Sequence, residues 1–143
     1  MGAHINVGRT LNQLGRYEDA EAAYLKAKSL LPKPIPGQRY VTRIAPQHLS
    51  VFLNLGNLMA KDPNRLEEAD SLYKQAISMR NDYVQAYINR GDVLIKMGKA
   101  EEAYNVYEQA LVFEPENPDL HCKQCFPLFI SMHTTESGYL FTF

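Results

Sequence analysis

The chain has 143 residues, of which 45% are apolar and 22% are charged, and its formal net charge is -1 at pH 7. This composition is typical of a folded globular protein, and the near balance of charges argues against a nucleic-acid-binding protein. No apolar run reaches the length of about 18 residues that indicates a transmembrane helix. The first residues also lack the basic and apolar stretches of a secretory signal.

Helical periodicity runs along most of the chain, and its breaks fall at glycine and proline. Gly15 and Gly98 can adopt the left-handed conformation that ends a helix, whereas Pro32 and Pro115 cannot continue one. A further turn is expected at Asp62-Pro63-Asn64. The predicted helices span about 2–14, 17–31, 48–60, 65–80, 84–97 and 99–113.

These helices form three pairs that share one pattern. In each pair a glycine is followed twelve or thirteen residues later by an alanine, then by a tyrosine after four residues and a second alanine after three. This spacing places the alanines and the tyrosine on one helix face, so that the small side chains allow close approach and the tyrosine fills the wedge above them. The pattern residues are Gly8, Ala20, Tyr24, Ala27 and Pro32, then Gly56, Ala69, Tyr73 and Ala76, then Gly91, Ala103, Tyr107, Ala110 and Pro115.

The pattern resembles the tetratricopeptide repeat, a helix-turn-helix unit of about 34 residues. The resemblance implies an all-α, right-handed superhelical solenoid of about three repeats. The sequence departs from the usual repeat at His4, where a large aromatic residue is common, and at Arg90, where an aliphatic residue is common. The expected organisation is repeat 1 at 1–34, an inter-repeat insertion at 35–48, repeat 2 at 49–83, repeat 3 at 84–117 and a degenerate tail at 118–143.

The insertion admits two interpretations. Its prolines and a glycine exclude a continuous helix at its start. It is either a loop that packs Tyr40, Val41 and Ile44 against the repeats, or a binding loop held by a rigid scaffold. The sequence leaves both open.

The tail starts a further hairpin and then loses the repeat pattern, because Pro127 interrupts the next helix. Cys122 and Cys125 form a C-x-x-C pair, with His121 and His133 nearby. Four such ligands can hold zinc, but an isolated pair is a weak signal, so no metal and no cofactor are predicted. No grouping of nucleophile, base and orienting residue suggests catalysis either.

The first helices of tetratricopeptide repeats line a concave surface. By helical phase, Ile5, Leu53 and Ile88 lie there among polar side chains. Because asparagine both donates and accepts hydrogen bonds, a protein or peptide ligand is predicted, although these residues can also simply face solvent or further repeats. The candidate binding residues are Arg9, Asn12, Asn54, Asn57, Lys61, Asn89, Asp92 and Lys96.

One specific binding mode is not expected. Repeats that bind the C-terminal carboxylate of heat-shock chaperones use Lys and Asn in the first repeat, Asn in the second, and Lys and Arg in the third. The matching residues here are Ile5, Arg9, Asn54, Gln85 and Asn89, of which only Asn54 fits.

Four strings point to a narrower resemblance. They are LPKPIPG at 31–37, RIAPQHL at 43–49, RLEEAD at 65–70 and QAISMR at 75–80. Together they resemble the C-terminal repeat region of the transmembrane and tetratricopeptide repeat-containing proteins, most closely the third member of that family. Members are multi-pass proteins of the endoplasmic reticulum that transfer mannose from dolichyl phosphate mannose to Ser or Thr, notably on cadherins.

In that family the catalytic acidic residues lie in the membrane portion and the repeats lie in the lumen. The resemblance therefore implies a non-catalytic interaction scaffold on the luminal side, without membrane contact of its own, that serves protein ligands such as a cadherin-like substrate. The alternative is a free-standing cytosolic adaptor that binds a peptide in its concave groove.

Overall fold

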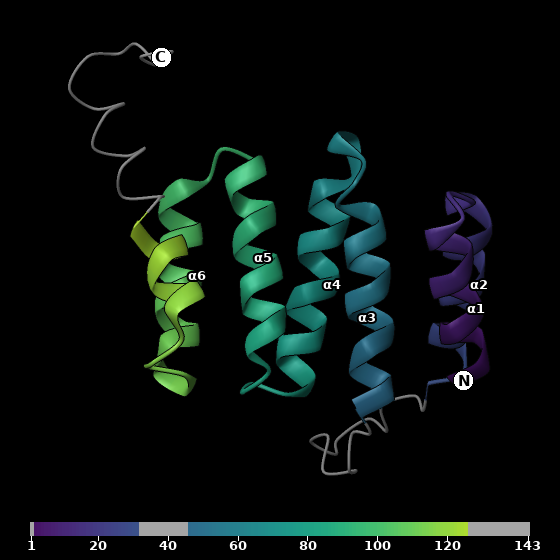
Figure 1. Ribbon diagram of the computed structural model, residues 1–143, viewed down its shortest axis with the longest axis horizontal. Coiled ribbons are helices and arrows are strands. Elements are labelled where there is room, and N and C mark those ends of the chain that lie inside the picture. The colour runs from purple at the N-terminus through teal and green to yellow at the C-terminus, as the bar shows by residue number, and fades with distance from the viewer. Residues whose placement is uncertain (1, 32–45, 126–143) are drawn as a thin grey trace, which may run out of the picture. The chain divides into compact units, whose positions relative to one another are not determined.

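A computed structural model describes residues 2–31 and 46–125 of the chain. Over these residues the fold is helical and no strand is present, as predicted. A short 3-10 helix at Pro63–Arg65 precedes the fourth α-helix. The α-helices shown in Figure 1 are α1 (Gly2–Gln13), α2 (Tyr17–Ser29), α3 (Pro46–Met59), α4 (Leu66–Met79), α5 (Val84–Lys96) and α6 (Ala100–Phe113).

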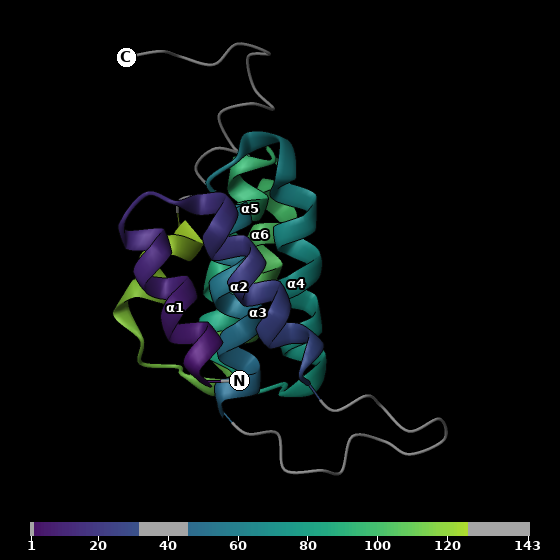
Figure 2. The same cartoon turned by 90° about the vertical axis from the view of Figure 1, so that its right-hand side faces the viewer.

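The chain divides into two compact units, which we call unit 1 (Met1–Asn81) and unit 2 (Asp82–Phe143). Unit 1 contains the hairpins α1–α2 and α3–α4, and α2 also packs against α3 (Figure 2). Unit 2 contains the hairpin α5–α6, followed by helical residues 118–125. Each of the three predicted helix pairs is therefore a hairpin.

Glycine ends the first helix in two of the hairpins. Gly15 and Gly98 have φ values of 77° and 76°, which confirms the left-handed conformation expected of them. Beyond Gly98, the Lys99 amide donates to the Leu94 carbonyl at 2.9 Å, which satisfies an end carbonyl of α5. The turn in the α3–α4 hairpin lacks a glycine, and there the Asp62 carboxylate accepts a hydrogen bond from the Asn64 amide at 2.9 Å.

A glycine–tyrosine contact holds each hairpin together. A Cβ atom added to Gly8 would lie 2.5 Å from Tyr24 Cε1, and one added to Gly56 would lie 2.7 Å from Tyr73 Cε1. Gly91 and Tyr107 make the same contact in the third hairpin. All three tyrosines and the six pattern alanines are buried, which confirms the predicted wedge. Of the two pattern prolines, Pro115 lies in the turn after α6, and Pro32 lies outside the described residues.

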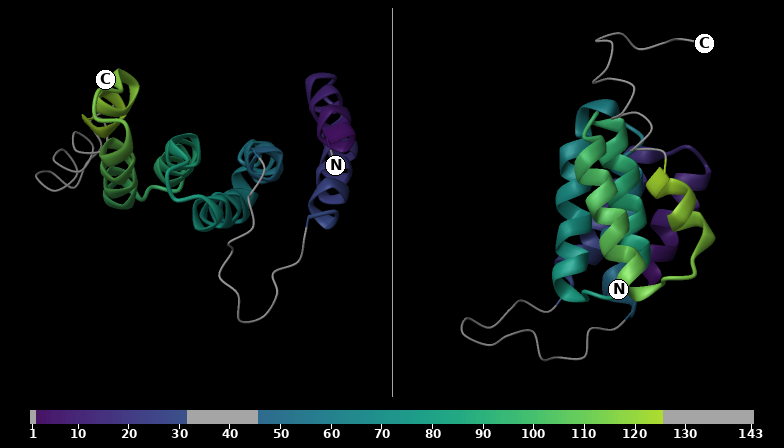
Figure 3. Two further views of the ribbon diagram at one scale, coloured as in Figure 1. Left: turned by 90° about the horizontal axis from the view of Figure 1, so that it is seen from below. Right: turned by 90° about the vertical axis from the view of Figure 1, so that its left-hand side faces the viewer.

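The chain continues as a helix after repeat 3, at residues 118–125 (yellow-green in Figure 3). Its start is capped by Asn117, whose Oδ1 accepts hydrogen bonds from the amides of Asp119 and Leu120 at 3.0 and 3.2 Å. Leu120 is completely buried, whereas Cys122 and Cys125 are exposed. The rest of the tail and residues 35–45 of the insertion lie outside the described residues. Both interpretations of the insertion concern that part of the chain.

Candidate functional site

The predicted binding residues of unit 1 lie on or just after its first helices, α1 and α3, and we call them the first-helix face. Lys61 follows α3, and its ammonium group donates a hydrogen bond to Asn12 Oδ1 of α1 at 2.7 Å. The same Lys61 Nζ lies 4.6 Å from the centre of the Tyr17 ring, within range of a cation–π interaction. Arg9 is exposed and precedes Asn12 by about one helical turn. The structure therefore brings Asn12 and Lys61 together, next to Arg9.

Other residues predicted for this surface make contacts within the protein or are buried. The Asn54 side chain donates to the Ser50 carbonyl of its own helix at 2.8 Å. Ile5 and Leu53, expected as apolar centres of the concave surface, are buried in the core of unit 1. The polar side chains that remain at the surface of this face in unit 1 are Arg9, Asn12, Asn57 and Lys61.

Asn57 and Asp92 have an internal role that sequence analysis missed. Each directly follows the pattern glycine of its hairpin, and each accepts a hydrogen bond from the hydroxyl of the pattern tyrosine. The distance is 2.6 Å both from Tyr73 to Asn57 Oδ1 and from Tyr107 to Asp92 Oδ1. Burial raises the pKa of Tyr107 strongly, and the hydrogen bond to the Asp92 carboxylate raises it further.

Unit 2 contains the remaining candidates. Asp92 Oδ1 also pairs with Lys123 Nζ at 2.7 Å, which ties residues 118–125 to α5. Asn89 Oδ1 accepts a hydrogen bond from Gln85 at 2.8 Å, and Lys96 is exposed at the end of α5. The binding role of all eight candidates stays a prediction.

Tyr24, the pattern tyrosine of the first hairpin, differs from the other two. The residue after Gly8 is Arg9, which has no acceptor atom. The Tyr24 hydroxyl is buried and has no hydrogen-bond partner among the described residues. Burial raises the pKa of Tyr24, while the positive charge of Arg9 and a polar contact from the Asn12 side chain, which lacks the geometry of a full hydrogen bond, lower it by a smaller amount. An unpaired buried hydroxyl destabilises a fold by about 1–3 kcal/mol, so this group needs an explanation.

This difference predicts that replacing the tyrosine by phenylalanine has different effects on stability in the first and second hairpins. Tyr73→Phe should lower the free energy of unfolding by about 1 kcal/mol, because it removes the hydrogen bond to Asn57. Tyr24→Phe should leave that free energy unchanged or raise it, because the hydroxyl it removes has no partner in the described residues. Urea unfolding of both variants measures the contrast. Equal destabilisation by the two substitutions would contradict it.

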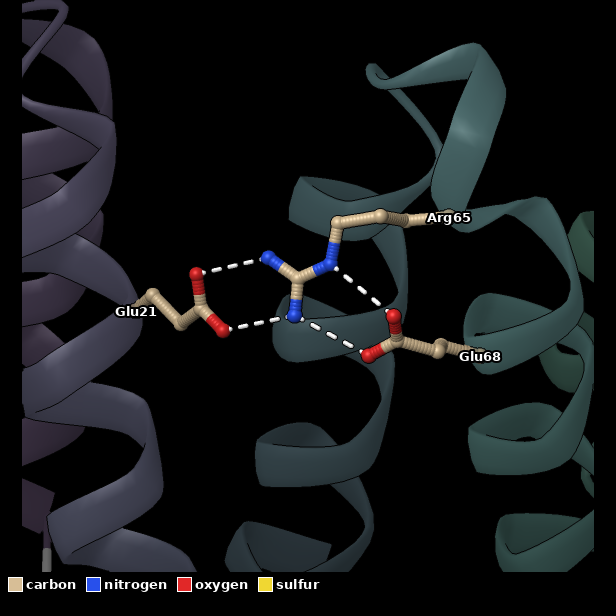
Figure 4. Close-up of polar contacts among 3 residues, drawn as sticks. All are labelled: Glu21, Arg65 and Glu68. Atoms are coloured by element: carbon tan, nitrogen blue, oxygen red, sulfur yellow. Dashed lines mark hydrogen bonds and ion pairs between the residues drawn. The ribbon is translucent and has the colours of Figure 1, made fainter.

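An ion-pair cluster joins the two hairpins of unit 1 (Figure 4). The Arg65 guanidinium donates to both carboxylate oxygens of Glu21 on α2, at 2.7 and 2.8 Å. It also donates to both oxygens of Glu68 on α4, at 3.0 and 3.2 Å. The Arg65 and Glu21 side chains are only 31% and 26% exposed, so solvent screens their pairing less than that of an exposed pair.

Glu21 gives stability a pH dependence through this pairing. Hydrogen bonds from Arg65 hold the pKa of Glu21 below 4.5 in the folded chain. The stabilisation is therefore fully present above pH 4.5, and it is lost as the pH falls through the lowered pKa of Glu21. We expect Glu21→Gln to reduce the free energy of unfolding by about 1 kcal/mol at neutral pH, and the difference from wild type to vanish in acid.

The control for this substitution is Asp19→Asn. Asp19 pairs with Arg16, but their side chains are 53% and 63% exposed. Its replacement should change the free energy of unfolding little at any pH. Urea unfolding across the acid range compares the two variants, and a constant deficit for Glu21→Gln would refute the linkage.

Comparison with known proteins agrees with the repeat pattern. A tetratricopeptide-repeat family profile matches residues 2–34, and a second profile, described as TPR repeat, matches residues 91–123. A solved structure of the first TPR of Spaghetti (RPAP3), bound to an HSP90 peptide, superposes with a TM-score of 0.72 at 20% identity. It covers 91% of this chain and 94% of that one. This likeness shows the all-α fold of a tetratricopeptide-repeat domain.

Two curated relatives are much more similar in sequence. Protein O-mannosyl-transferase Tmtc3 of Drosophila melanogaster is 66% identical over 99 residues, which are 69% of this chain and 11% of that protein. Protein O-mannosyl-transferase TMTC3 of Homo sapiens is 54% identical over 120 residues, which are 84% of this chain and 13% of that protein. The chain thus spans about one eighth or less of the length of these relatives. In residues 2–31 and 46–125, no helix has the length and apolar character needed to cross a bilayer.

Proposed function

The chain is an array of tetratricopeptide repeats of the kind carried by the TMTC3 protein O-mannosyl-transferases, and we propose that it is the part of such an enzyme that binds protein. The observation that carries this proposal is the high identity to these enzymes, combined with a fold that solved neighbours use to hold peptides. The repeats then act as a scaffold on the luminal side of the endoplasmic reticulum. The transfer of mannose from dolichyl phosphate mannose takes place elsewhere in the enzyme.

The surface chemistry fits a protein ligand. The first-helix face of unit 1 offers a guanidinium group, an ammonium group and amides, which can bind carboxylates and the polar backbone of an extended segment. Extended segments that carry Ser or Thr are suitable acceptors for mannose, and a cadherin-like protein is the substrate class that we propose. The described residues contain no cluster of His, Cys, Asp and Glu suited to a metal. The role proposed for this region is the binding of protein.

A pair of chimeric enzymes tests the proposal. In the first, this chain replaces the matching 99 residues of the Drosophila enzyme. In the second, the first repeat domain of Spaghetti, which has the same fold at 20% identity, takes the same place. Both are expressed in cells that lack the endogenous enzyme, at matched abundance, and mannose on cadherin peptides is measured by mass spectrometry.

We expect the first chimera to transfer mannose and the second to fail, because only the first presents the surface shared with the enzyme. Equal transfer by both chimeras would overturn the proposal, since any repeat array of this fold would then suffice. Failure of the first chimera at normal abundance would overturn it as well.

A further inference from the structure

We propose that Arg9, Asn12 and Lys61, together with the Tyr24 hydroxyl, form a site for an acidic peptide segment with two neighbouring Asp or Glu side chains. This inference rests on the proposed function and specifies the chemistry of its ligand. It concerns unit 1 alone.

The first argument is charge. Arg9 and Lys61 have no carboxylate partner among the described residues, whereas Arg65, on the same unit, is paired with two. Lys61 instead donates to an amide oxygen, Asn12 Oδ1, and Asn12 lies next to Arg9 on α1. Two cations without a carboxylate partner among the described residues, Arg9 on α1 and Lys61 just after α3, match two acidic side chains. A single terminal carboxylate would neutralise only one of them.

The second argument is the buried Tyr24 hydroxyl. In the other two hairpins an acceptor follows the pattern glycine and holds the tyrosine, but in the first hairpin Arg9 takes that place. Arg9 and Asn12 are close enough to Tyr24 to lower its pKa. Donor groups therefore predominate here, since Lys61 already uses Asn12 Oδ1, and Arg9 and the Tyr24 hydroxyl add donors near it. Such a set suits a ligand group that only accepts hydrogen bonds, as an ionised carboxylate does.

Binding of the peptide would also give the Tyr24 hydroxyl a hydrogen-bond partner. When a ligand carboxylate pairs with the Lys61 ammonium group, Lys61 no longer donates to Asn12 Oδ1. That oxygen can then accept a hydrogen bond from the Tyr24 hydroxyl. The first hairpin would then carry the tyrosine–acceptor hydrogen bond that the second and third already have. A group that destabilises the free chain would in this way favour the bound state.

The test uses the full 143-residue chain and three fluorescent peptides of equal length. One has blocked ends and two adjacent aspartates, the second has asparagines in their place, and the third has no acidic side chain but a free C-terminal carboxylate. Fluorescence anisotropy should show binding of the aspartate peptide, weakening as salt is added, and much weaker binding of the other two. Equal affinity for the asparagine peptide, or for the peptide with the free carboxylate, would overturn the proposal.

Matched variants test whether the aspartate peptide binds at this site. Arg9→Gln and Lys61→Gln should each weaken binding of the aspartate peptide about fivefold or more, since each removes one charge-assisted contact. Lys26→Gln makes the same charge change on α2 and should bind as wild type. Tyr24→Phe should weaken binding about threefold without loss of stability, which separates the site from unfolding. Wild-type affinity in the Arg9 and Lys61 variants would overturn the proposal, while leaving the chimera result as an independent test of the proposed function.

Discussion

Gly56→Ala is expected to lower the free energy of unfolding by about 1–3 kcal/mol, although alanine is the better helix former by about 1 kcal/mol. The added Cβ would lie 2.7 Å from Tyr73 Cε1 and 2.9 Å from Tyr73 Cζ. The ring has little freedom to move away, because it is buried and its hydroxyl is bound to Asn57. α3 and α4 must therefore separate or the ring must leave its site. Urea unfolding followed by circular dichroism measures the loss.

Gly2→Ala is the control for Gly56→Ala. The nearest atom to its added Cβ, Gln47 Oε1, would be 3.9 Å away, which is an ordinary contact. This variant should remain within about 0.5 kcal/mol of wild type. If Gly56→Ala proved as stable as Gly2→Ala, then the close approach of α3 to Tyr73 would not be a constraint of this fold.

Leu120→Ala is expected to lower the free energy of unfolding of unit 2 by about 2–4 kcal/mol. Leu120 is completely buried, although it belongs to the first turn of helical residues 118–125, where the repeat pattern is being lost. Its removal leaves a cavity in the core of unit 2. Thermal and urea unfolding of the full chain would show the loss in the transition that reports unit 2.

Leu14→Ala provides the same substitution on the surface. Leu14 is 68% exposed, so its replacement should change stability by no more than about 0.5 kcal/mol. Similar stability of the Leu14→Ala and Leu120→Ala variants would show that residues 118–125 do not cover repeat 3 in solution.

The hairpins were predictable because one pattern occurs three times and depends on local contacts. Glycine, alanine and tyrosine at these spacings leave few ways to pack two helices, and the structure confirms the contact in each hairpin. Helix ends were predicted to within about two residues. The helix expected from residue 48 begins at Pro46, a residue type that suits the first turn because it has no amide hydrogen to leave unpaired.

The polar contacts were harder to predict because they join residues far apart in the chain. The three-residue spacing of Arg65 and Glu68 on one helix turn indicates that they can pair. Nothing in the sequence, however, places Glu21 beside Arg65, which is 44 residues away. The same holds for Asn12 and Lys61, which are 49 residues apart. For Asn57 and Asp92 a signal was present. Both follow the pattern glycine and both carry an acceptor, so their bonds to the tyrosines, and the exception at Arg9, could have been inferred by comparing the repeats.

The ion pair between Arg65 and Glu21 has a consequence for cooperativity. In a linear array, the coupling energy between neighbouring repeats determines whether the terminal one frays alone or unfolds together with the next. Arg65 adds to that coupling at the boundary between the first two hairpins, α1–α2 and α3–α4. The amides of α1 and α2 should therefore exchange with solvent at rates close to those of α3 and α4. Such coupling keeps Arg9 and Asn12 in register with Lys61, so a ligand need not supply the free energy to order the first hairpin.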